Sequence, residues 1–125
     1  MRYDIYAVIR LLVILALGLS VGHAQNRNDE IRLKATVKAV ILLSDFSGTI
    51  TPVHFDPLFA LTVRIESANP AISDFRVGSV VTFGIHSPSM LFAGDPKKGK
   101  TYDFVLHRTI ENGRVRFLGL QLLRP

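Results

Sequence analysis

The sequence predicts an all-β protein: a small five-stranded barrel with one short helix between the third and fourth strands. Three observations predict this fold class. Apolar residues recur at every second position in several segments, stretches containing glycine and proline separate those segments, and Asn112-Gly113 is typical of a tight hairpin turn. The chain has 125 residues, 48% of them hydrophobic, and no cysteine. A hydrophobic core rather than disulfide bonds must therefore stabilise the fold.

The N-terminal residues 1–24 have the three-part pattern of a secretory signal peptide. Positively charged residues are followed by an uncharged apolar run over residues 11–21, and small residues then precede a cleavage site before Gln25. This run is shorter than the ~20 residues that a membrane-spanning helix needs. We expect cleavage to leave one exported domain, residues 25–125, that is periplasmic or extracellular and does not span a membrane. An uncleaved membrane anchor and a buried helix are the alternatives.

Five segments have the alternation or the apolar character of strands. They are residues 31–43, 58–66, 79–86, 100–110 and 115–123. In the first four, one face carries the core residues that we expect, including Ile31, Leu33, Leu61, Phe83 and Phe104. In the fifth, the apolar set changes face between Phe117 and Leu118, and Gly119 is a candidate bulge.

The connections between these segments differ in length. Residues 44–57 contain glycine and two prolines, which predicts a long loop with a short extended piece near 49–51. Residues 67–78 predict a connection with one helical turn at 71–75. Ser87-Pro88 predicts the start of a short helix or turn that ends near Gly94.

This order of elements resembles an OB-fold barrel, over nearly all of residues 31–123 and without a signature motif. The resemblance implies binding of oligonucleotides or oligosaccharides by the face of strands 2 and 3 and by the loops after strands 1 and 4. Here the connection after strand 4 is a two-residue turn, so only the loop 44–57 is long. Another small β-barrel and an open sheet packed by one helix are alternative architectures.

Basic residues are the main candidates for ligand binding, because the net charge is +5 and several lie on expected outward faces. The candidate set, with two residues of the long loop, is Arg32, Lys34, Lys38, Arg64, His54, Phe55, Lys97, Lys98 and Lys100. If they converge, they form a cationic surface for phosphate, an acidic glycan or an anionic membrane. The alternative is that exposed strand faces carry charge for solubility.

Other chemistries have weaker support in the sequence. The chain has no tryptophan and places most aromatic residues on inward faces, so nucleic acid is possible as a partner but not favoured. His54, His86 and His107, with Asp56, are candidate metal ligands but lack ligand spacing. A Ser87 or Ser89 nucleophile with a histidine and Asp103 lacks the Gly-x-Ser-x-Gly motif. We therefore expect no catalytic residue, no bound metal and no cofactor.

The function that we expect is a small exported, non-enzymatic binding or interaction module, with the loop 44–57 and the adjoining strand faces as its contact surface. Its partner is an unknown protein or polyanionic ligand. The first alternative is binding of a polyanion, nucleic acid or acidic glycan, through a basic strand face. The second is a small exported metal protein or hydrolase that uses His54, His86 or His107.

Overall fold

The computed structural model describes residues 27–123, so the predicted signal peptide, residues 1–24, and its cleavage before Gln25 lie outside the described residues. The described part of the chain divides into two compact units. The larger unit contains residues 29–108 and 117–123, and the smaller contains residues 27–28 and 109–116. Both candidate sites described below lie within the larger unit.

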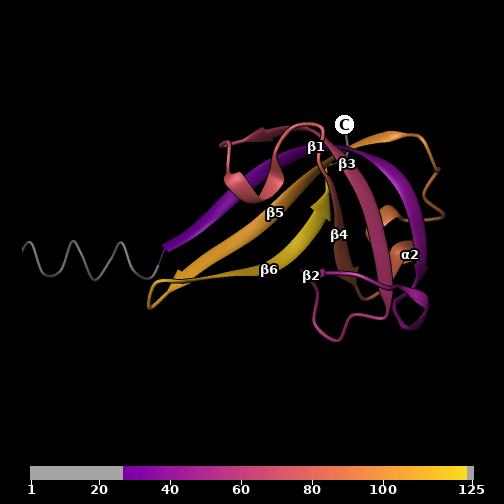
Figure 1. The fold of residues 1–125 in the computed structure, drawn as a ribbon, viewed down its shortest axis with the longest axis horizontal. Coiled ribbons are helices and arrows are strands. Elements are labelled where there is room, and N and C mark those ends of the chain that lie inside the picture. The colour runs from indigo at the N-terminus through magenta and orange to yellow at the C-terminus, as the bar shows by residue number, and fades with distance from the viewer. Residues whose placement is uncertain (1–26, 124–125) are drawn as a thin grey trace, which may run out of the picture. The chain divides into compact units, whose positions relative to one another are not determined.

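Strands account for most of the described residues (Figure 1). They are β1 (Arg27–Leu42), β2 (Thr51–Pro52), β3 (Phe59–Asn69), β4 (Val80–Ile85), β5 (Thr101–Glu111) and β6 (Arg114–Leu122). The helix α2 (Pro88–Phe92) lies between β4 and β5, and two 3-10 turns are η1 (Leu43–Asp45) and η2 (Ser73–Phe75). The all-β class and the position of the short helix are confirmed.

The predicted number of strands was wrong, because the structure has six rather than five. The additional strand is β2, which lies inside the segment 44–57, where the sequence predicts a long loop with a short extended piece near 49–51. Thr51 and Pro52 pair in parallel with Phe83 and Gly84 of β4. Two residues are too short for a period-two pattern, so only pairing with β4 identifies them as a strand.

The strands form one mixed sheet in the order β2-β4-β3-β1-β5-β6. β1 and β4 each pair antiparallel with β3. The pairing of β1 with β3 shifts register between Lys34 and Ala35 and again between Val37 and Ala39. Bulges of this kind bend a strand and increase its twist, and within the larger unit β1 is visibly curved (Figure 1).

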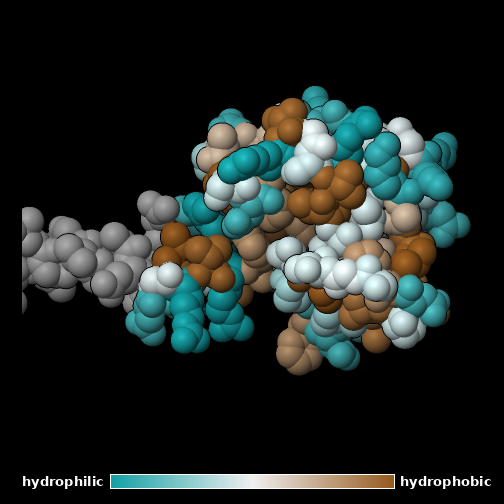
Figure 2. All heavy atoms as spheres, in the orientation of Figure 1, coloured by the Kyte–Doolittle hydropathy of each residue, from teal (hydrophilic) through white to brown (hydrophobic). Residues whose placement is uncertain are grey.

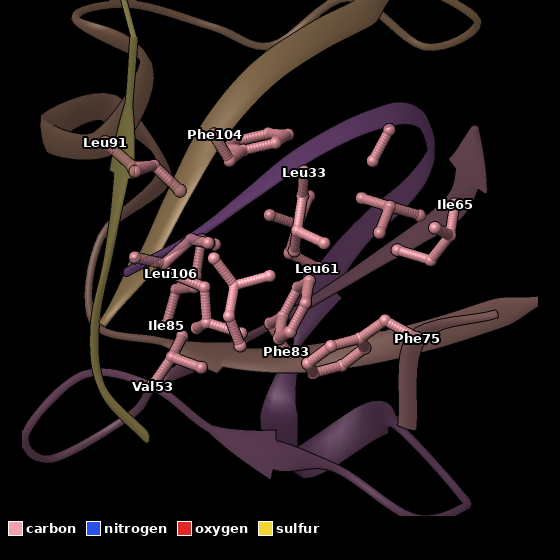
Figure 3. Packing of buried hydrophobic residues seen from close by; sticks show 14 of the residues in the cluster. Leu33, Val53, Leu61, Ile65, Phe75, Phe83, Ile85, Leu91, Phe104 and Leu106 are labelled. Atoms are coloured by element: carbon pink, nitrogen blue, oxygen red, sulfur yellow. The ribbon is translucent and has the colours of Figure 1, made fainter. Parts of the chain in front are cut away.

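The core lies on the face of the sheet that the sequence predicted (Figure 3). The expected inward residues Ile31, Leu33, Leu61, Phe83 and Phe104 are all buried. Other parts of the chain complete this core with Val53 after β2, Phe75 from η2, Leu91 from α2 and Leu120 from β6. Elements outside the strands therefore cover the same apolar face.

Two residues whose positions alternate with the expected core residues, and which the period of two therefore places on the outward faces, are buried instead, for different reasons. Thr36 is 5% exposed, and its hydroxyl hydrogen-bonds to Glu66 Oε1 and Thr101 Oγ1 at 2.8 and 2.7 Å. Ala60 is fully buried because it pairs with Gly84, and the segment 44–57 packs against that glycine. A Cβ atom on Gly84 would lie 3.1 Å from Pro57 Cβ.

The hairpin between β5 and β6 has the predicted turn. Asn112 and Gly113 have φ values of 52° and 76°, the two positive values that a type I′ turn requires. In β6, Leu118 was expected to share the buried face of Leu120 but is 59% exposed. Phe117 contacts the core in its place, with its ring centroid 5.5 Å from that of Phe75.

Replacing Phe104 by alanine should lower the free energy of unfolding by about 3–5 kcal/mol, because it deletes a fully buried aromatic side chain. Urea unfolding followed by circular dichroism measures this change. Lys97→Ala is the matched surface control and should change the free energy by less than about 0.5 kcal/mol. A neutral Phe104→Ala would contradict the placement of β5 on the core.

Candidate functional site

A hollow of about 460 Å³ lies where the end of β4 and the helix α2 approach β6. It is lined by His54, His86, Ser87, Met90, Leu91 and residues 120–122. The two edge strands of the sheet are β2 and β6. We call the line along which these edges approach each other the seam, and the hollow the seam hollow. His54 follows β2 closely in the chain, so the hollow lies between the two edges.

Local chemistry explains why α2 forms one wall of this hollow. Ser87 precedes the helix in an extended conformation, and its Oγ accepts a hydrogen bond from the Met90 backbone N–H at 3.3 Å. Proline at the first helical position needs no N–H partner. Leu91 anchors the helix in the core, whereas Met90 faces outward and is 78% exposed.

The imidazole of His54 connects the two sides of the seam hollow. Its Nε2 lies 2.8 Å from the carbonyl oxygen of Leu120, and its Nδ1 accepts the backbone N–H of His86 at 3.3 Å. A carbonyl oxygen only accepts, so Nε2 carries the proton and donates. The ring is therefore a neutral Nε2–H tautomer, and both of its nitrogens are occupied by backbone groups.

His86 has one ring nitrogen available for chemistry. Its Nδ1 lies 3.0 Å from the carbonyl oxygen of Asp56 and must donate to it. In the neutral ring, Nε2 then carries the free lone pair. The sequence singled out both His54 and His86, and the structure brings them together, but they hold backbone groups rather than each other's side chains.

The remaining residues of the metal and hydrolase hypotheses do not complete a site. His107 Nε2 lies 3.2 Å from Gln121 Oε1, so it reaches the seam hollow only through that glutamine. Within residues 27–123, no three histidine, aspartate or glutamate side chains converge as metal ligands. Ser87 Oγ caps α2, and Asp103 lines a different hollow.

The open edge of β6 is a feature that sequence reasoning missed. The Leu123 N–H donates to the backbone carbonyl of Asp103 in β5 at 2.8 Å, whereas the Leu120 carbonyl accepts a hydrogen bond from His54, which is not part of β5, at 2.8 Å. Backbone groups alternate in direction along an antiparallel strand. The N–H groups of Leu120 and Leu122 and the carbonyl of Leu122 therefore point toward the seam hollow.

The segment 44–57 is only in part the free contact loop that we expected. Val53 is 1% exposed and belongs to the core, while Phe55, two residues later, is 96% exposed. Phe55 lies between His54, which lines the seam hollow, and Asp56, whose φ of 53° is left-handed. Hydrophobic residues also lie among hydrophilic ones on the face drawn in Figure 2.

Several of the predicted basic residues occupy neighbouring positions. Thr36 pairs with Arg64, so β1 and β3 bring Arg64 beside the row that contains Arg32, Lys34 and Lys38. A turn next to β1 carries Lys97, Lys98 and Lys100. Two backbone hydrogen bonds hold this turn against Val37 of β1: the Gly99 N–H donates to the Val37 carbonyl at 2.8 Å, and the Val37 N–H donates to the Lys100 carbonyl at 2.9 Å.

Carboxylates interrupt this basic surface. Arg64 Nε donates to Glu66 Oε1 at 2.8 Å, and Lys34 Nζ lies 4.0 Å from Asp103 Oδ1. The Lys100 ammonium lies 4.9 Å from the centroid of the Tyr102 ring. The surface is therefore a mixture of paired and unpaired cations rather than a uniform positive field.

No protein-family model, no curated protein and no solved structure is significantly similar to this chain. The part of the chain that the structure describes holds no helix of the length and hydrophobicity needed to cross a membrane.

Replacing His54 by alanine should lower the free energy of unfolding by about 1–3 kcal/mol, because it leaves the His86 N–H and the Leu120 carbonyl without their partner. Hydrogen exchange of the His86 amide should accelerate in the same variant. His107→Ala removes an exposed contact and should cost less than about 0.5 kcal/mol. Equal stability of the two variants would show that His54 does not hold the seam.

Glu66 should make the protein less stable in acid. A hydrogen bond from the Thr36 hydroxyl, and after it one from Arg64, holds the pKa of Glu66 below its ordinary value. A carboxylate with a lowered folded-state pKa stabilises the fold above its unfolded pKa, and this contribution disappears as pH falls through the folded pKa. Urea unfolding of Glu66→Gln should therefore show a shallower loss of stability below about pH 4–5. An unchanged pH profile would contradict this role.

Proposed function

We propose that this protein is an exported, non-enzymatic binding module that takes an extended peptide segment of a partner protein along the edge of β6. The observation that carries the proposal is the outward direction of the Leu120 and Leu122 backbone groups at the seam hollow. An extended peptide satisfies such groups by adding a strand to the sheet. The export rests on the sequence pattern of residues 1–24.

Backbone pairing would supply the main attraction. The Leu120 carbonyl shows that a donor from outside the sheet can reach this edge, because His54 Nε2 already bonds to it at 2.8 Å. The neighbouring Leu122 offers one N–H and one carbonyl in the same direction. A short peptide can therefore form a ladder that continues from the bond made by His54.

The seam hollow beside this edge would select which side chain of the peptide binds, because one side chain of the peptide would enter it. Its volume of about 460 Å³ lies within the usual range of roughly 300–1,000 Å³ for ligand pockets. Met90 and Leu91 from α2 and Leu122 from β6 give it an apolar wall, beside the polar side chains of His54, His86, Ser87 and Gln121. Exposed methionine adapts to differently shaped partners, so we expect an aliphatic or aromatic side chain to enter the hollow.

We also propose an OB-like architecture as the origin of this site. The five longer strands stand in the order β4-β3-β1-β5-β6, with the helix between β4 and β5. A partly open five-stranded barrel with one gap has this kind of arrangement. The gap falls between β6 and the opposite edge, where β2 pairs with β4; His54 crosses this gap, and the peptide would enter there.

The test is an NMR titration of the full-length protein with an acetylated Val-Thr-Val-Thr-Val peptide. Amide signals of residues 118–122 and of His86 should shift, and those of the basic turn at residues 95–100 should not. A peptide of the same sequence with alternate amide nitrogens methylated cannot form the ladder and should bind at least about tenfold more weakly.

The methylated peptide leaves the protein unchanged, so this comparison does not depend on a variant that folds. Met90→Ala serves as the matched protein variant, because Met90 is exposed and its truncation should weaken binding without loss of stability. Equal binding of the two peptides, or shifts confined to other parts of the sheet, would overturn the proposal.

A further inference from the structure

We infer that a second hollow, beside Arg32 and Lys34 of β1, is a binding site for a phosphate group. It has a volume of about 370 Å³ and lies across β1, β3 and β5. Its polar lining consists of Arg32, Lys34, Ser67, Asn69 and Asp103. The inference rests on side chains that take no part in the proposed peptide site.

The two cations of this hollow are available to a ligand. Within residues 27–123, no hydrogen bond or ion pair engages the guanidinium of Arg32. Lys34 contacts Asp103 only at 4.0 Å, and both side chains are more than half exposed. A pair of this kind contributes little to stability, so an anion can displace it at little cost.

Other cations on the same sheet differ in this respect. Arg64 donates to Glu66 Oε1 at 2.8 Å, and Arg108 forms a 2.7 Å ion pair with Asp29. The Arg108–Asp29 pair is mostly buried. Arg32 is therefore distinguished from these two arginines by the lack of a carboxylate partner and by its position in a hollow.

The register of the sheet adds neutral donors to the cations. Arg32 pairs with Asn69 and Lys34 pairs with Ser67, and side chains opposite each other in a sheet lie on the same face. A guanidinium, an ammonium, a hydroxyl and a carboxamide thus surround one space. A tetrahedral phosphate has more acceptor oxygens than a planar carboxylate, and it can use this number of donors.

Asp103 restricts the ligand to a small anionic group. Its carboxylate lines the same hollow, and Glu66 of β3 lies further along the sheet, where it accepts hydrogen bonds from Thr36 and Arg64. A continuous polyanion along β1 would meet both carboxylates, whereas a single phosphate can contact Arg32 and Lys34 alone. The same chemistry is presented by a small phosphorylated solute and by a phospholipid headgroup.

The test is an NMR titration of the full-length protein with inorganic phosphate at constant ionic strength, with sodium chloride as the control salt. Phosphate should shift the amide signals of Leu33, Ser67 and Asn69, and chloride should not. Sedimentation with phosphatidylglycerol vesicles forms the second arm. Binding of inorganic phosphate assigns a small solute as the ligand, and binding to vesicles alone assigns the lipid headgroup.

The deciding variant is Arg32→Ala combined with Lys34→Ala. It should reduce the affinity for whichever ligand binds, inorganic phosphate or the vesicles, by at least about tenfold, because hydrogen bonds between charged groups are stronger than those between neutral groups. Lys97→Ala combined with Lys98→Ala removes the same charge from the exposed turn and should change affinity by less than about twofold. Circular dichroism checks that both variants fold.

Equal losses in the two double variants would overturn the inference, because the attraction would then depend on net charge alone. Shifts that chloride reproduces at the same ionic strength, or no binding in either arm, would overturn it as well. Neither result bears on the peptide titration, which monitors residues 118–122 and His86. The two proposals therefore fail separately.

Discussion

The sheet of the larger unit curls over one apolar face while its strand order remains linear, so two edges meet without a shared backbone ladder. Burial of residues such as Leu33, Leu61 and Phe83 supplies most of the driving force for this curl. The same curl brings the end of β2 within reach of β6. His54 then bonds to backbone groups on both sides, in the place where a closed barrel would have strand pairing.

This incomplete closure explains why the seam hollow exists. A continuous ladder between β6 and the opposite edge of the sheet would pair the backbone groups of β6 and close the space beside α2. Instead, one imidazole bonds to β6 at Leu120, and β6 remains an edge strand of the described sheet. The exposed Met90 and the exposed Phe55 lie on segments that flank this gap. An edge strand beside a hollow of mixed polar and apolar lining is suited to an extended peptide.

The outward side chains of β1 and its neighbouring strands interact through charge rather than through backbone pairing. Charged side chains there are largely exposed to solvent and form ion pairs, within β3 between Arg64 and Glu66 and between β1 and β5 at Lys34 and Asp103. Thr36 is buried among them because its single hydroxyl proton goes to Glu66 while Thr101 donates to its oxygen. Arg32 stands outside this network and faces a hollow. The two candidate sites thus use different groups of the same sheet, backbone atoms at its edge and cations on its outer side.

Sequence periodicity by itself determined the all-β class, the five longer strands and the buried face of β1, β3, β4 and β5, and short local motifs determined the short helix and the type I′ turn. These features follow from local rules, because a period of two sets which side of a strand is apolar and because Asn-Gly adopts positive φ. Only the tertiary structure decided that Thr51–Pro52 is a strand, that Ala60 is buried and that His54 bridges to Leu120. Each of these features depends on contacts between segments that are far apart in the chain and meet only when the sheet curls. Local sequence patterns do not predict such contacts. The open edge of β6 belongs to the same class, since an edge is defined by the strand that fails to lie beside it.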